Sequence, residues 1–268
     1  MRWSGLRLSV TLLTAIPLRG TAPERPPSRA IVAAAMTWAP AVGLLLGAVA
    51  AAVLVVADHT LGVGPLTAAG LSVAALAALT RGLHLDGLAD LADGLGSGQP
   101  ASIALDIMRR SDIGPFGTVT LILALLIQVA AISHAESPGP AGGAAALIAA
   151  VVTGRLALTW ACRQGVPAAR PDGLGALVAG TVRLAIPVAL TLAAVMAAVV
   201  VSVTVTVEPL GWTLPLAVVA GLAAAFVVQR QSVRRLGGIT GDVLGALAEV
   251  ATTVSLVVAT MGPRALPY

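Results

Sequence analysis

Three carboxylates stand within eight residues, directly after a long apolar stretch of the chain. The segment from 81 to 98 reads RGLHLDGLADLADGLGSG, and its acidic residues are Asp86, Asp90 and Asp93. In a helix, spacings of four and seven residues place these side chains within about 60° of one another on one face. Like charges on one face repel, and carboxylate oxygens suit Mg²⁺, so the spacing predicts a divalent-cation site. A solvated helix start, where acids favour the N-terminal dipole, is the plainer alternative.

The same segment carries glycines at 87, 94, 96 and 98. Each glycine lowers helix stability by up to about 1 kcal/mol, so a helix start alone does not account for them. We expect these glycines to allow a phosphate to approach backbone N–H groups closely.

A second segment, ALDIMRRSDIGPFG from 104 to 117, sets Arg109 and Arg110 beside Asp112. Guanidinium groups bind phosphate oxygens in a bidentate manner, and a metal held by carboxylates can bridge the same diphosphate. The segment therefore predicts phosphate recognition. Anchoring of the two arginines at the membrane surface explains them equally well.

Two later segments carry further charged residues. CRQGVPAARPDGLG, from 162 to 175, contains Arg170 and reads most simply as a turn between helices. RRLGGITGDVLGALAEV, from 234 to 250, places Asp242 and Glu249 on one helix face, two turns apart. Asp242 suits a helix N-terminus, whereas Glu249 lies inside an apolar stretch, where an ionisable residue is costly and indicates function.

The composition places these residues in an integral membrane protein. Hydrophobic residues make up 57% of the chain, charged residues only 10%, and the mean hydropathy is +0.96. Few aromatic and many small residues favour closely packed helices over a barrel, so we expect an all-α, polytopic bundle in one domain, 1–268. The N-terminal apolar run is too short to span and predicts an interfacial helix. About seven spans are expected, at roughly 30–57, 65–80, 115–133, 142–162, 184–206, 212–229 and 243–261.

The positive charges follow a topological pattern. All 16 basic residues are arginines, and they concentrate in segments 1–29, 81–114, 163–183 and 230–242. By the positive-inside rule these four segments face the cytoplasm, which puts most of the acids at the cytoplasmic mouth of the bundle. Because the arginines are spread over loops between spans, we expect no nucleic-acid partner. The single cysteine, Cys162, excludes a disulfide framework within the chain.

The strings GLHLDGLADLADG (82–94), LDIMRRSDIGPFG (105–117), ARPDGLG (169–175) and LGGITGDVLGALAE (236–249) resemble those of the cobalamin synthase family, the adenosylcobinamide-GDP ribazoletransferases. The resemblance runs almost end to end and includes LTAIPL at 13–18. It implies a magnesium-dependent enzyme of the bacterial inner membrane, with its active site on the cytoplasmic side. In that family a ribose hydroxyl of α-ribazole, or of its 5′-phosphate, attacks the cobinamide-linked phosphorus of adenosylcobinamide-GDP, and GMP leaves. A homo-oligomer and other enzymes of the same pathway are compatible partners.

The resemblance also implies roles for individual residues. Asp86, Asp90 and Asp93 would hold Mg²⁺, with Asp93 or His84 as the base. Candidates for contacts with the substrates are Arg109, Arg110, Asp112, Arg170, Gly238, Asp242 and Glu249. His84 lies about 160° from the acidic face if the helix includes it, so its participation requires a helix that begins near Asp86. The chain departs from the family pattern at Arg110-Ser111-Asp112, where Asp-Ser-Arg is common, and at Ala168, where Tyr is common.

Two other functions compete with this interpretation. A CDP-alcohol phosphotransferase shares the opening Asp90-Leu91-Ala92-Asp93-Gly94, but its following Ala-Arg is replaced here and its later acidic motif is missing. A metal-ion transporter would carry acids near the bilayer midplane on several spans, whereas here the acids gather at one mouth.

Overall fold

The computed structural model describes residues 2–16, 27–136, 140–204 and 212–261. Within these residues every regular element is a helix, and no strand occurs. In chain order the elements are α1 (Arg2–Leu13), α2 (Arg29–Val55), the π-helical turn η1 (Val56–Thr60), α3 (Pro65–Leu79), α4 (Leu83–Gly96), α5 (Ala101–Ile107), α6 (Pro115–Glu136), α7 (Pro140–Ala161), α8 (Gly173–Val178), α9 (Ala185–Thr204), α10 (Thr213–Leu236) and α11 (Gly241–Ala259). The expected all-α class is confirmed.

Six helices of the described chain are long and apolar enough to cross a membrane. They are α2 with η1, α6, α7, α9, α10 and α11. The helices α3 and α4 pass the same test only together, and they meet at an angle of 89°. The expected count of about seven spans therefore holds if this bent pair counts as one, and the multi-pass helical bundle is confirmed.

The break between α3 and α4 explains why the segment expected to span at 65–80 does not cross by itself. Arg81 and Gly82 have φ angles of +56° and +67°. This left-handed conformation does not continue a right-handed helix, and Arg81 adopts it without the freedom of glycine. The chain therefore turns sharply and starts α4 three residues before the first acid of the cluster, Asp86.

The helices α7 and α11 form the centre of the bundle. In each of them 67% of the most apolar stretch is buried inside the protein, against 22% for α6 and 17% for α9, which lie at the periphery. Small residues let the central helices approach closely. A Cβ on Gly154 of α7 would lie 2.7 Å from the carbonyl oxygen of Ala248 on α11, and one on Gly221 of α10 would lie 2.7 Å from that of Ala251.

The N-terminal helix α1 has 12 residues, too few to cross a membrane, as expected of an interfacial helix. It packs along α2, where a Cβ on Gly5 would lie 2.6 Å from the Cβ of Ala34. The Ala15 N–H donates to the carbonyl of Leu79 at 2.6 Å, which ties the chain after α1 to the end of α3. The last two residues of the LTAIPL string, 17–18, lie outside the described residues.

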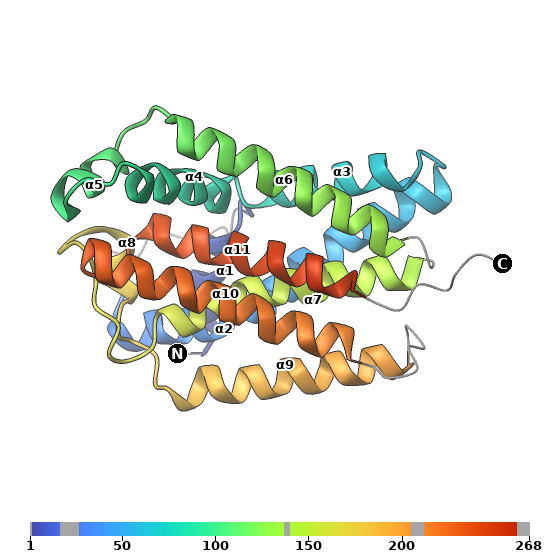
Figure 1. Ribbon diagram of the computed structural model, residues 1–268. Coiled ribbons are helices and arrows are strands. Elements are labelled where there is room, and N and C mark those ends of the chain that lie inside the picture. The colour runs from blue at the N-terminus through green and yellow to red at the C-terminus, as the bar shows by residue number, and fades with distance from the viewer. Residues whose placement is uncertain (1, 17–26, 137–139, 205–211, 262–268) are drawn as a thin grey trace.

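Figure 1 shows that the short helices α5 and α8 lie at the same end of the bundle. The C-terminal end of α4, the first turns of α6 and α11 and the last turn of α10 lie beside them. The four strings singled out by their charges therefore meet at one end of the molecule.

Candidate active site

The acidic segment forms the expected helix, and its three carboxylates sit in different environments. Within α4, Asp86 is exposed, Asp90 is half-buried and Asp93 is buried. The helix begins at Leu83, so it already includes His84. The condition for His84 to join the acidic face is therefore not met.

A fourth carboxylate joins the acids of α4. Asp242 stands in the first turn of α11, and the negative charges of both Asp86 and Asp242 act on Asp90. Gly87 makes this approach possible, because a Cβ there would lie 2.6 Å from the backbone oxygen of Asp242. The guanidinium of Arg170 supplies positive charge to Asp90 and Asp242. We call Asp86, Asp90, Asp242 and Arg170 the acid–arginine cluster.

Arg170 is placed by the loop that precedes α8. The Ala169 N–H donates to the carbonyl of Ile239 at 3.0 Å, and the Ile239 N–H donates to that of Pro167 at 3.0 Å. Gly238 lies against this loop, where a Cβ would fall 2.5 Å from the Ala169 nitrogen. Position 238 thus needs a residue without a side chain, and the backbone pairing of Ile239 fixes the ARPDGLG string beside the start of α11.

Two arginine side chains attach α5 and its following loop to the same place. The Arg170 guanidinium donates to the carbonyl of Leu105. Arg109 donates to the carboxylate of Asp172, with Nη2 at 2.9 and 3.1 Å from the two oxygens. Arg110 and Asp112 are exposed on the same loop, and the structure gives neither an ion pair with another described residue.

Asp93 turns toward α6. Its two carboxylate oxygens accept hydrogen bonds from the N–H groups of Gly114 at 2.7 Å and Gly117 at 2.9 Å. Gly114 directly precedes α6 and Gly117 lies in its first turn, so their N–H groups have no partners within that helix. Asp93 therefore caps a neighbouring helix, and a side chain at either glycine would collide with its carboxylate.

Three of the four glycines of the acidic segment lie against protein atoms, where the sequence predicted an approach of a phosphate. Gly87 faces the backbone of α11, while Cβ atoms on Gly94 and Gly96 would lie 2.6 Å from Met108 and Phe116 respectively. Protein atoms thus fill the space at these three positions. Gly98 has open space around it and a φ of +66°, which ends the segment in a turn.

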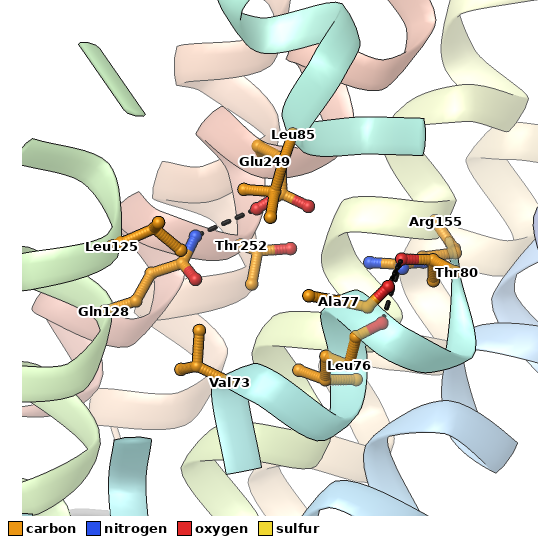
Figure 2. A pocket seen from close by; sticks show the side chains of 10 residues that line it. All are labelled: Val73, Leu76, Ala77, Thr80, Leu85, Leu125, Gln128, Arg155, Glu249 and Thr252. Atoms are coloured by element: carbon orange, nitrogen blue, oxygen red, sulfur yellow. Dashed lines mark hydrogen bonds between the residues drawn. The ribbon is translucent and has the colours of Figure 1, made fainter. Parts of the chain in front are cut away.

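A second group of polar residues lies deeper in the bundle, around a small cavity of about 20 Å³ (Figure 2). Its lining includes Glu249, 9% exposed, whose carboxylate accepts a hydrogen bond from Gln128 Nε2 at 2.9 Å. Arg155, 3% exposed, lines the cavity too, and its Nε has no hydrogen-bond partner. One Arg155 nitrogen lies 3.4 Å from Nδ1 of the buried His84.

The structure therefore separates the predicted site residues into groups. Asp86, Asp90, Asp242 and Arg170 come together in the acid–arginine cluster, with Arg109, Arg110, Asp112 and Gly238 on the loops that surround it. Three predicted site residues make contacts outside this cluster, namely Asp93, His84 and Glu249. Sequence reasoning did not single out Gln128, although a glutamine inside an apolar span is itself an indication of a buried polar contact.

No group of three or more His, Cys, Asp or Glu side chains in the described part of the chain is arranged as a ready metal cage. Mg²⁺ does not require one, because it is commonly held by one or two carboxylates together with waters and substrate phosphates. The acid–arginine cluster holds three carboxylates against one guanidinium, and this excess of carboxylates fits that kind of binding.

The fold and the cluster define a multi-pass helical membrane protein that gathers carboxylates and arginines at one end of its bundle. A family model, described as cobalamin-5-phosphate synthase, matches residues 5–260, and the chain belongs to this family. It is 43% identical to an adenosylcobinamide-GDP ribazoletransferase of Frankia casuarinae, covering 95% of this chain and 94% of the relative. Proteins of the same name from Nocardioides sp. and Bradyrhizobium diazoefficiens are 39% and 35% identical, over 93% and 95% of this chain and 95% and 92% of their own lengths. No solved structure matches the chain.

Proposed function

We propose that this protein joins α-ribazole, or its 5′-phosphate, to adenosylcobinamide-GDP and releases GMP. A ribose hydroxyl oxygen forms the new bond to the cobinamide-linked phosphorus, and the bond from that phosphorus to the GMP oxygen breaks. Membership of the cobalamin-5-phosphate synthase family and the names of the relatives support this reaction over the CDP-alcohol and transporter alternatives. The observation that carries the proposal is the acid–arginine cluster, in which residues from three of the four charged strings meet.

The reaction places three demands on the protein. It must neutralise charge on the diphosphate, stabilise the leaving GMP and accept the proton of the attacking hydroxyl. We assign Arg170 and the exposed Arg110 to the phosphate oxygens, because guanidinium groups match their geometry. We assign the hydroxyl proton to Asp242, which faces the α4 carboxylates from another helix. Asp93 is a poorer acceptor because backbone N–H groups already occupy both of its oxygens.

Magnesium is the cofactor we propose, held by Asp86 and Asp90. Bound there, it would neutralise developing charge on the diphosphate oxygens. The bundle would cross the bacterial inner membrane with the acid–arginine cluster on the cytoplasmic side. The arginines near this end, among them Arg109 and Arg163, support that orientation.

The test is an assay of the full chain in lipid vesicles with adenosylcobinamide-GDP, α-ribazole and Mg²⁺, in which GMP and the joined corrinoid are both measured. We expect Asp90→Asn to lower the rate of GMP release by about 100-fold or more, in the range seen when one group that stabilises transition-state charge is removed from an active site. Asp106→Asn, the same change at an exposed position on α5, is the matched control and keeps its rate. A wild-type rate in the Asp90 variant, or an equal rate after removal of divalent cations, contradicts the assignment.

A further inference from the structure

An apolar groove lies between α7, α9, α10 and α11, away from the acid–arginine cluster. Its volume is about 380 Å³, within the range of about 300–1,000 Å³ typical of ligand pockets. Its lining residues Val219 and Phe226 are 51% and 50% exposed, so the groove opens onto the outer surface of the bundle. Because Val219 and Gln229 both line it and stand ten residues apart on α10, it extends about 15 Å along the helix.

The polar side chains that line the groove are already satisfied within the protein. Trp160 Nε1 donates to Thr191 Oγ1 at 2.9 Å, and that hydroxyl donates to the carbonyl of Pro187 at 2.7 Å. Gln229 Nε2 donates to the carbonyl of Ala161 at 3.3 Å. The remaining lining is Ala, Val, Leu and Phe, so the groove favours an apolar occupant.

A cation stands at one end of the groove. Arg163 follows the last residues of α7, and its guanidinium carbon lies 5.9 Å from the ring centre of Trp160 and 5.6 Å from that of Phe226. Arg163 Nη1 donates to the Trp160 carbonyl and to Gln229 Oε1, both at 2.8 Å.

No described carboxylate pairs with Arg163, and its Nε and Nη2 donate to none of the described residues. Two nitrogen atoms of this half-buried guanidinium, with three N–H groups between them, thus have no acceptor among the described residues beside the apolar groove. A zwitterionic headgroup brings its own positive group beside its phosphate and compensates the guanidinium poorly. The phosphate of an anionic headgroup, which carries no such positive group, compensates it.

We propose that this groove binds an anionic phospholipid, with one acyl chain along α10 and the phosphate at Arg163. The groove supplies the length and the apolar walls, and the guanidinium supplies the charge. Trp160 is the second-last residue of α7, and aromatic rings are enriched near the ends of membrane-spanning helices, between acyl chains and headgroups. The site is independent of the proposed transferase activity.

The experiment is native mass spectrometry of the delipidated full chain in detergent, titrated with phosphatidylglycerol or with phosphatidylcholine of the same acyl chains. We expect one phosphatidylglycerol to bind more tightly than phosphatidylcholine. Arg163→Gln is expected to weaken phosphatidylglycerol binding by about tenfold and to remove the preference between the two lipids. Ala223→Phe, which fills the groove from α10, is expected to weaken both lipids.

Two control variants lie on the same helix. Arg230→Gln removes an exposed arginine, and Val227→Phe enlarges a side chain that is 63% exposed and does not line the groove. Both are expected to bind lipid as the wild type does. An equal loss in Arg163→Gln and Arg230→Gln would overturn the proposal in favour of general charge attraction.

Three other results also overturn it. The first is competition by glycerol 3-phosphate as strong as that by phosphatidylglycerol, which would indicate a site for free phosphate. The second is a change in the dimer fraction of Ala223→Phe without a change in lipid binding, which would make the groove an interface between two copies. The third is unchanged lipid binding in Ala223→Phe with wild-type helical content by circular dichroism. Ala223→Leu gives the same test with a smaller side chain if the Phe variant does not fold.

Discussion

The sequence pattern predicts that Asp93 is a magnesium ligand or a base, whereas its contacts in the structure predict a role in stability. Its carboxylate joins α4 to the start of α6 through two N–H donors, at 2.7 and 2.9 Å. Asparagine keeps only one acceptor oxygen and turns an NH₂ group toward the second donor. A hydrogen bond to a charged group is worth about 1.5–3 kcal/mol, and the charge near a helix N-terminus adds about 0.3–1 kcal/mol. We therefore expect Asp93→Asn to lower the free energy of unfolding by about 2–4 kcal/mol.

Gly117→Ala tests the same connection without touching the carboxylate. The new methyl group would collide with Asp93 and would lie 2.9 Å from the carbonyl oxygen of Ala89, so α6 must move away from α4. Overpacking of this kind costs about 1–3 kcal/mol. Asp93→Asn and Gly117→Ala are both expected to lower the stability of the protein. Both are also expected to lose part of the activity, because the loop between α5 and α6 is displaced.

The measurement is reversible unfolding of the purified protein in mixed micelles of detergent and SDS, followed by tryptophan fluorescence, beside the GMP-release assay. Asp106→Asn serves as the charge-matched control and is expected to unfold as the wild type does. The reasoning is refuted if Asp93→Asn abolishes activity at wild-type stability while Gly117→Ala remains stable and active. That pattern would return Asp93 to the role of metal ligand or base.

Two further predictions concern the deeper polar group and the topology. Glu249→Gln removes the carboxylate that attracts the buried Arg155 and accepts a hydrogen bond from Gln128. We therefore expect this variant to lose about 1–3 kcal/mol of unfolding free energy. The double variant that also carries Arg155→Met is expected to recover part of that loss. Additive losses in the two single changes would contradict this coupling. A cysteine at Ser97, in a Cys162→Ala background, is expected to react with a membrane-impermeant maleimide only from the cytoplasmic side. Labelling from the periplasm alone would reverse the proposed orientation.

The helices could be predicted from the sequence because apolar runs of about 20 residues are a local property of the chain. The exception is the span expected at 65–80. There the apolar composition continues, but Arg81 and Gly82 turn the chain, and a non-glycine residue with positive φ leaves no clear signal in composition. The helical acidic face of α4 was also predictable, since it depends only on spacing within one element.

The partners of each acid could not be predicted in the same way. Asp86, Asp90 and Asp93 are equivalent as a pattern, yet Asp93 pairs with backbone 21 and 24 residues later, whereas Asp90 faces a carboxylate from α11. These partners depend on how α4 packs against α6 and α11. The contacts of Gly87 could not be predicted for the same reason. This glycine makes room for the backbone of α11, and the sequence alone does not distinguish that from room for a phosphate.

The bonds that connect the four strings differ in strength, and this decides what keeps the site in shape. The ion pair of Arg109 and Asp172 is exposed on both sides, with side chains 52% and 65% accessible, and such pairs contribute about 0–1 kcal/mol. The approach of α4 to α11 at Gly87 is buried and tolerates no added methyl group. The acid–arginine cluster is therefore held together mainly by helix packing. The surface ion pair of Arg109 and Asp172 positions the loop that carries Arg110. A substitution that widens the packing at Gly87 should separate Asp90 from Asp242 more than any loss of the surface ion pair does.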